Sequence, residues 1–261
     1  MSPPAKMYPG APASCIKAGR AQLPVSAFLI EIPGHKPVLV DAGWGRAVSP
    51  DGVYDHAAAR RFLPERLCAY WHPVTPKGMS VCEQLEAMHL SPADLETVLL
   101  TTLEPDHAAG LHELHEAPRL ELPEWEKFWT GRTVYALRQP RSLWEKLPLR
   151  VFYYRGVPEG PVRHAWDLLG DGSIQCVSTP GYTEGVCALL VHSPSGKFAV
   201  VQSSVAMFQT NLGTENVPMA GFNRQYQKNA LAWLTEVSRR SDCAAVVCGH
   251  DPEDTRTEIE F

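Results

Sequence analysis

The chain has 261 residues, with 24 Lys and Arg against 29 Asp and Glu, and a formal net charge of −5. A chain of this length can build a large core, and a hydrophobic fraction of 44% with 20% charged residues excludes a disordered protein. The mild acidity argues against a nucleic-acid-binding protein, which would carry a basic excess.

The sequence also lacks the signals of membrane and secreted proteins. No apolar run approaches the roughly 18 residues that a membrane-spanning helix needs, and the first residues lack the apolar stretch of a secretory signal. The seven cysteines are scattered without a C-x-x-C pair, which is typical of reduced thiols and not of a disulfide framework. We therefore expect a cytoplasmic protein with no membrane partner.

The first half of the chain predicts an arm, a hairpin and two helices. Residues 1–20 are rich in Pro and Ala, and we expect them to form a poorly ordered N-terminal arm ahead of a single domain over 21–261. From Pro24, two apolar runs separated by PGHKP predict a β-hairpin. Residues 54–70 favour a helix that Pro64 limits or kinks. Residues 80–89 predict a helix with a Ser80–Glu83 capping box.

The second half alternates between predicted strands and helices. The pattern indicates strands over 97–101, 133–137, 174–178, 186–192, 197–202 and 244–248, and helices over 140–147 and 223–240. Together these segments predict a mixed α/β protein.

Three polar clusters come directly after predicted strands, over residues 101–110, 179–185 and 249–253. A strand fixes the position of the side chains that follow it while the loop exposes them, so such clusters are typical of functional sites.

These clusters carry a resemblance to a known family. The ordered motifs LVDAG, T-x-x-x-D-H-A-x-G, TPG-x-T-x-G and GHDPE resemble the metallo-β-lactamase fold, and within it the N-acyl-homoserine lactonase branch, over residues 22–255. The resemblance implies an αβ/βα four-layer sandwich, in which two mixed β-sheets are flanked by helices. It also implies a small-molecule substrate of the lactone or ester type.

The metal-ligand positions of the family are mostly substituted in this chain. Active members hold two metal ions. Carried over, the histidines of the first site fall on Thr102, Glu104 and Tyr182, and the bridging Asp falls on Ser204 or, less favourably, on Ser203. Three ligands of the second site remain, and they are Asp106, His107 and His250. The resemblance therefore implies a degenerate dinuclear site that binds one divalent ion (zinc, iron or manganese) or none.

Two other residues of the clusters, Glu104 and Tyr182, each have a functional and a structural interpretation. Glu104 is a candidate fourth ligand or general base, and alternatively a solvated carboxylate or the partner of a nearby Arg. Tyr182 is a candidate hydrogen-bond donor to substrate, and alternatively fills the space of a lost ligand. The family's carbonyl-polarising tyrosine falls on Met207, with Phe208 next. Asp41 is expected to bond loop amides without binding metal.

The candidate catalytic residues are thus Glu104, Asp106 and Tyr182, and the candidate substrate contacts are Tyr182, Ser204, Met207 and Phe208. Two functions stay open. The first is a divergent hydrolase of a small lactone or ester that works with one metal ion or without metal. The second is a pseudoenzyme that binds a small molecule or a protein partner in the pocket where the family has its active site. The sequence does not determine the oligomeric state.

Overall fold

The computed structural model describes residues 3–9, 13–17, 21–130, 132, 137–202, 204–218 and 221–261. Its first sheet has seven strands in the order β16 (Ile259–Glu260), β1 (Lys6–Pro9), β4 (Phe28–Glu31), β5 (Val38–Val40), β7 (Thr97–Leu99), β8 (Leu120–Pro123) and β9 (Leu149–Phe152). The second has six, in the order β10 (Arg155–Gly156), β11 (His164–Asp167), β12 (Ile174–Ser178), β13 (Cys187–His192), β14 (Phe198–Gln202) and β15 (Cys243–Cys248). Both are mixed, since β5, β7, β8 and β9 run parallel, as do β14 and β15, and the other pairs are antiparallel.

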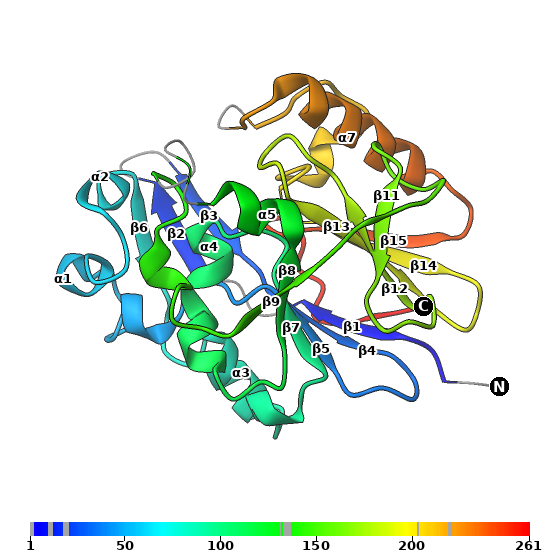
Figure 1. Cartoon of the computed structure of the whole chain (residues 1–261). Helices are drawn as coiled ribbons and strands as arrows, with labels where there is room; N and C mark the ends of the chain where they lie inside the picture. Colours follow the sequence, from blue (N-terminus) through cyan, green and yellow to red (C-terminus); the bar gives the residue numbers. More distant parts are fainter. Residues whose placement is uncertain are drawn as a thin grey trace.

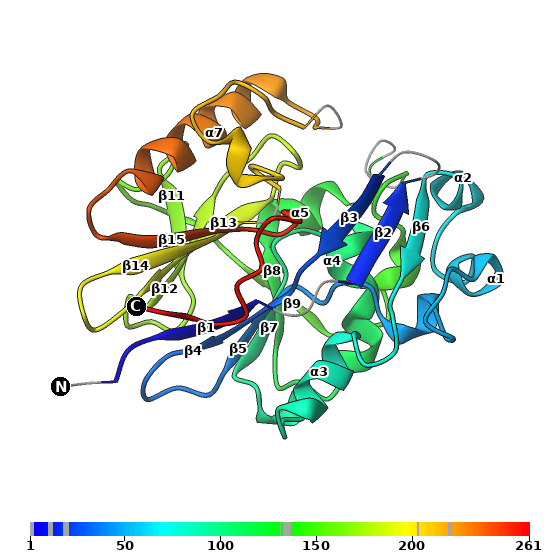
Figure 2. The same cartoon turned by 180° about the vertical axis from the view of Figure 1, so that it is seen from behind.

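Figure 1 shows the two sheets with α3 (Val81–Ala87), α4 (Pro105–Ala108) and α5 (Glu124–Trp129) beside the first sheet and α7 (Arg224–Ser238) over the second. Seen from behind in Figure 2, a small third sheet of β3 (Ala21–Val25), β2 (Ala13–Lys17) and β6 (Trp71–Val74) lies next to α1 (His56–Ala59) and α2 (Glu65–Cys68). The layers confirm the predicted four-layer sandwich.

The alternation of side chains along the strands explains these layers. Leu29 and Leu39 belong to a core shared with Leu85 of α3, whereas their neighbours Phe28 and Val40 belong to the core between the two sheets. Successive side chains of a strand point to opposite faces, so an apolar run such as FLI must be covered on both sides. A third core packs α7 on the outer face of the second sheet, and it includes Val200, Leu231 and Leu234.

Several predicted elements are confirmed with small changes of boundary. The hairpin is β4 and β5, and the 223–240 helix is α7. The capping box forms in both directions, because the Ser80 hydroxyl accepts from the Glu83 amide and Glu83 accepts from the Ser80 amide. The 54–70 helix is divided into α1 and α2, since Pro64 has an extended ψ of 150° and begins the second piece.

Two expectations differ from the structure. The helix predicted over 140–147 is only a 3₁₀ turn at Arg141–Leu143, because Trp144 leaves the helical region with φ −144°. Residues 6–9 of the predicted poorly ordered arm form β1, which pairs with both β4 and β16 and buries Met7 completely. The strand predicted over 133–137 lies, apart from residue 137, outside the described residues, and the domain boundary stays a prediction.

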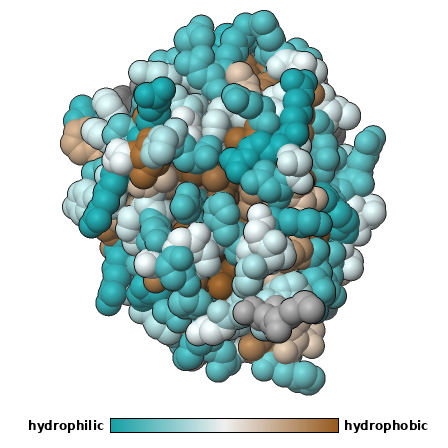
Figure 3. Space-filling view, turned by 90° about the vertical axis from the view of Figure 1, so that its right-hand side faces the viewer, coloured by the Kyte–Doolittle hydropathy of each residue, from teal (hydrophilic) through white to brown (hydrophobic). Residues whose placement is uncertain are grey.

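None of the helices in the described ranges combines the length and apolar character needed to cross a membrane. Polar residues cover most of the face shown in Figure 3, and its apolar side chains form small separate patches.

Candidate metal centre

The three predicted metal ligands lie together in the structure. Asp106 and His107 belong to α4, which follows β7 after one short loop, and His250 lies two residues beyond β15. One ligand atom from each of the three side chains can be chosen so that all lie within 4.8 Å of one another, and all three residues are buried. Segments about 140 residues apart therefore build one site where the ends of strands from the two sheets meet.

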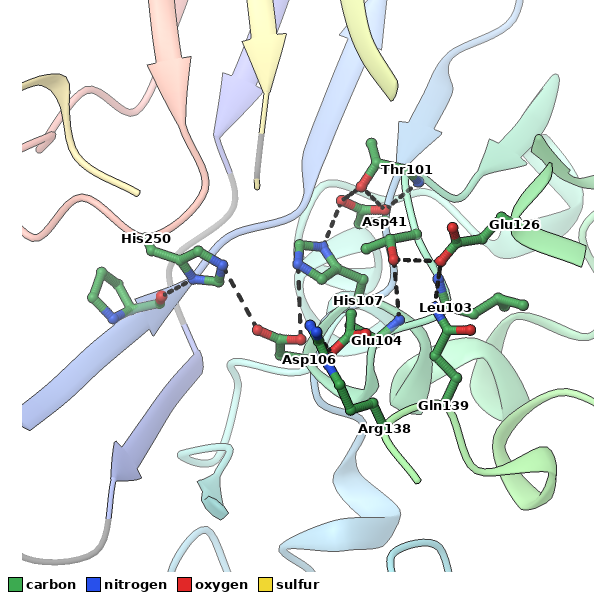
Figure 4. A network of polar contacts seen from close by, with 12 residues as sticks. Asp41, Thr101, Leu103, Glu104, Asp106, His107, Glu126, Arg138, Gln139 and His250 are labelled. Atoms are coloured by element: carbon green, nitrogen blue, oxygen red, sulfur yellow. Dashed lines mark hydrogen bonds and ion pairs between the residues drawn. The ribbon is translucent and has the colours of Figure 1, made fainter. Parts of the chain in front are cut away.

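The two imidazoles are oriented as metal-ligating histidines are. Nδ1 of His107 lies 2.8 Å from Oδ2 of Asp41, and Nδ1 of His250 lies 2.9 Å from the Pro24 carbonyl oxygen. These acceptors fix a proton on each Nδ1 and turn Nε2 toward the site, where it is the ring atom that a metal ion would bind. Figure 4 shows both Nε2 atoms directed at Asp106.

The distances around Asp106 suit a bound cation better than direct hydrogen bonds. Its Oδ1 lies 3.8 Å from Nε2 of His107, and its Oδ2 lies 3.7 Å from Nε2 of His250. Both separations exceed the range of a hydrogen bond. Two imidazole nitrogens and one carboxylate that converge at this spacing are a donor set that zinc, iron and manganese accept.

Asp41 accepts a hydrogen bond from an amide of the loop that follows β7, as predicted. Its Oδ1 accepts from the Thr101 amide at 2.7 Å, and its carboxylate also accepts from the Thr101 hydroxyl. Its backbone has φ 62°, a conformation that Asp tolerates better than most residues. The contact with His107 was not evident from the sequence, since 66 residues separate the two side chains.

The charges of the site favour a cation. Burial lowers the pKa of His107, but the carboxylates of Asp106 and Asp41 outweigh it and raise this pKa to about 9. Burial lowers the pKa of His250. The protein alone therefore keeps His107 protonated at neutral pH, and a metal ion would have to displace that proton.

The residues onto which the first-site histidines of the family were carried over, Thr102, Glu104 and Tyr182, make other contacts in the structure. Glu104 instead pairs with Arg138, with its Oε2 3.0 Å from Nη2 and 3.1 Å from Nε. The guanidinium carbon lies 4.7 Å from the centre of the Tyr182 ring and 4.8 Å from that of Phe222. Burial raises the pKa of Glu104 to about 7, although Arg138 opposes this shift. Of the readings given for Glu104, the structure shows the contact with an Arg.

Thr102 is buried and contacts another carboxylate. Its hydroxyl donates to Oε1 of Glu126 at 2.6 Å. The Glu126 carboxylate also accepts from the Leu103 amide at 2.8 Å, from the Gln139 amide group at 2.5 Å and from the Thr183 hydroxyl at 2.7 Å. This buried carboxylate joins three loops around the site, and no local pattern in the sequence indicates its role.

Ser204 is buried just beyond β14, and its hydroxyl has no hydrogen-bond partner within the described ranges. Gln202 of β14 pairs in register with Cys248 of β15, so Ser204 and His250 follow neighbouring strand ends by two residues each. Ser203 lies outside the described residues. The backbone amide of Phe208 donates to the Asn211 side chain, and both Met207 and Phe208 are half-buried; their role toward a substrate stays a prediction.

The architecture and the site define the chain as a protein with the metallo-β-lactamase fold. The N-acyl homoserine lactone hydrolase structure with bound N-hexanoyl-L-homoserine superposes with a TM-score of 0.73, at 18% identity over 97% of this chain and 95% of that one. A probable metal-dependent hydrolase from Staphylococcus aureus superposes with a TM-score of 0.67, at 14% identity over 98% of this chain and 91% of that one.

In sequence, the chain is similar to the N-acyl homoserine lactonase AttM of Rhizobium radiobacter, with 25% identity over 239 residues that cover 89% of this chain and 83% of the relative. It is also 25% identical to the probable metallo-hydrolase Rv2300c of Mycobacterium tuberculosis, over 83% of this chain and 71% of the relative. No protein-family model matches the sequence. These likenesses confirm the resemblance to lactonase-like proteins of this fold.

Proposed function

We propose that the chain is a hydrolase that opens a small lactone or cleaves a related ester with one divalent metal ion. The observation that carries the proposal is the convergence of two Nε2 atoms and the Asp106 carboxylate, with both Nδ1 atoms held by acceptors outside the site. Relatives that are named as lactonases and metallo-hydrolases support the class of reaction.

In such a site some residues would bind the ion and others would orient those ligands. Asp106, His107 and His250 would hold the ion, which when bound polarises a carbonyl and lowers the pKa of a water molecule. Asp41 and the Pro24 carbonyl hold the two imidazoles in the ligating tautomer. Since three residues supply the ligands, positions remain for substrate and water.

Metal content tests the proposal most directly. Protein purified without chelator should contain about one equivalent of zinc, iron or manganese per chain, and it should hydrolyse some members of a panel of lactones and esters. Asp106→Ala should lose both the metal and the hydrolysis. Asp171→Ala is the matched control, because it removes another Asp–His pair, in which Asp171 of the β11–β12 turn lies 2.9 Å from His35 of the β4–β5 turn.

Three outcomes would overturn the proposal. Protein without metal that gains no thermal stability when zinc is added would exclude the single-ion site. Two equivalents of metal would mean that the substituted positions still bind. A metal-loaded protein that hydrolyses nothing in the panel would favour the alternative function, a pseudoenzyme that binds a ligand in the pocket where the family has its active site.

A further inference from the structure

One cavity of the molecule lies between α5, the loop that follows β12 and the first turn of α7 (Figure 1). Its volume is about 300 Å³, which is at the lower end of the range for pockets that bind small molecules. The side chains that line it include Trp125, Trp129, His164, Pro180, Glu184 and Tyr226. The three proposed metal ligands do not line this cavity, so it is a separate site.

Two large aromatic residues of this cavity are unusually exposed. Trp125 exposes 45% of its surface and Tyr226 exposes 43%, although aromatic side chains of this size are mostly buried in folded proteins. A third ring, that of Trp129, is half-buried, and the guanidinium carbon of Arg132 lies 4.6 Å from its centre. The faces of Trp and Tyr rings attract cations, and Trp does so most strongly. The cavity therefore has walls that suit a positively charged ligand.

A carboxylate without a counter-charge belongs to the same cavity. Glu184 is half-buried and forms no ion pair with the Lys, Arg and His residues that the structure describes. Its partial burial raises its pKa, and the negative charge of Glu126 adds to this shift. The described residues of the cavity wall include neither Lys nor Arg, and Nδ1 of its one histidine, His164, lies 2.7 Å from the Val162 carbonyl oxygen. A bound cation would provide the missing charge.

Close packing fixes the parts of the wall relative to one another. The Thr183 hydroxyl donates to Glu126 of α5 at 2.7 Å, and a Cβ on Gly185 would overlap the backbone of Glu126. The loop that follows β12 therefore packs directly on α5. The same loop packs on α7, because a Cβ on Gly181 would overlap the backbone of Gln227. A pocket that is formed before its ligand arrives avoids the free-energy cost of ordering its walls during binding.

We propose that this cavity binds a small organic cation that carries a quaternary or alkylated ammonium group. The rings of Trp125 and Tyr226 contact the alkyl groups on the nitrogen, and the Glu184 carboxylate supplies the counter-charge. An alkylated ammonium group is apolar on its outside and positively charged overall, which matches aromatic walls beside one carboxylate. An anion would be repelled by Glu184. The inference goes beyond the proposed hydrolase and does not depend on it, because the two sites share no residue.

The experiment compares two probes of the same shape. Choline carries a trimethylammonium group, and 3,3-dimethylbutan-1-ol has a carbon atom in place of the nitrogen and no charge. Each probe is titrated into ¹⁵N-labelled protein, and the indole N–H signals of the tryptophans are followed by NMR. The titration is done at about pH 8, where an ordinary carboxyl group is ionised and an ordinary imidazole is neutral. Wild type should bind choline about tenfold more tightly than the neutral alcohol.

Substitutions in the wall should weaken choline binding. Trp125→Leu keeps an apolar side chain but removes the ring, and it should weaken choline binding by about 5- to 30-fold. The indole signal that this variant lacks also identifies Trp125 in the wild-type spectrum. Glu184→Gln removes the charge at nearly constant shape, so it should weaken choline binding by about 3- to 10-fold and leave the affinity for the alcohol unchanged. If Trp125→Leu does not fold, Tyr226→Leu replaces it with the same expectation.

Two matched variants outside the cavity, Tyr70→Leu and Glu116→Gln, remove an exposed ring and an exposed carboxylate and should bind choline as wild type does. Equal affinities of wild type for the two probes would overturn the proposal, as would wall variants that bind choline like wild type. Absence of saturable binding up to about 50 mM choline would also overturn it. Asp106→Ala tests the hydrolase separately, since it should lose the metal and still bind choline. Loss of choline binding together with the metal would place the cation elsewhere and overturn the proposal.

Discussion

The substitution Asp41→Asn tests whether the two imidazoles are prepared for a metal ion. Asn occupies nearly the same volume and tolerates the φ of 62° at this position. Its remaining oxygen can still accept from the Thr101 amide, which lies 2.7 Å from Oδ1. Its amide group then replaces Oδ2 opposite Nδ1 of His107, at the place where that nitrogen finds its acceptor 2.8 Å away.

This change reverses the hydrogen bond of His107. An amide donor opposite Nδ1 requires that nitrogen to accept, so the proton moves to Nε2, which faces Asp106. Nε2 then has no lone pair for a metal ion. Loss of such a supporting carboxylate typically weakens metal binding by about 10- to 100-fold, which corresponds to about 1.4 to 2.7 kcal/mol.

Zinc affinity measured by competition with a chromophoric chelator gives the readout, and urea unfolding of the metal-free proteins gives the stability. Asp171→Asn, which changes an exposed Asp–His pair, is the control and should bind zinc as wild type does. A zinc affinity of Asp41→Asn within twofold of wild type, in a folded protein, would refute the proposed role of the His107 orientation.

Three further predictions concern stability, measured by urea unfolding. The hydrogen bonds from Arg46 lower the pKa of Glu83 from 4.5 to about 2, so the pair stabilises the fold above pH 4.5 and loses this effect as the pH falls toward 2; Glu83→Gln should cost about 1–2 kcal/mol at pH 7 and progressively less in acid. Glu126→Gln places an amide donor against buried donors and should cost about 2–4 kcal/mol. Gly110→Ala should cost about 3 kcal/mol, because its Cβ would overlap the Ala42 carbonyl oxygen, whereas Gly156→Ala meets nothing within 4 Å and should be tolerated.

Each of these has a contrary outcome. A cost of Glu83→Gln that does not change between pH 7 and pH 3 would exclude the ion pair as its origin. Glu126→Gln within 0.5 kcal/mol of wild type would show that the surrounding loops reorient at no cost. Equal stabilities of Gly110→Ala and Gly156→Ala would show that the loop carrying Ala42 moves freely.

Local patterns in the sequence predicted much of the fold. The apolar strands β12–β15, the amphipathic α7 and the Ser80–Glu83 capping box each follow from residues close together in the chain. The sequence predicted less where tertiary contacts determine the conformation of a segment. The Pro- and Ala-rich start of the chain becomes β1 because β4 and β16 pair with it on both sides, and no local pattern reports a strand partner about 250 residues away.

The candidate site also combines residues that the sequence predicted with residues that only the structure revealed. The family resemblance carried by the motifs D-H and GHDPE assigned Asp106, His107 and His250 as candidate metal ligands, and the structure places these three side chains together. Only the tertiary structure supplied Arg138 and Glu126, which lie 34 and 24 residues from the groups they contact. A buried charge takes whichever partner the packed loops bring to it, and packing depends on the whole chain. The sequence thus determined which side chains could bind a metal ion, and the fold decided which charges surround them.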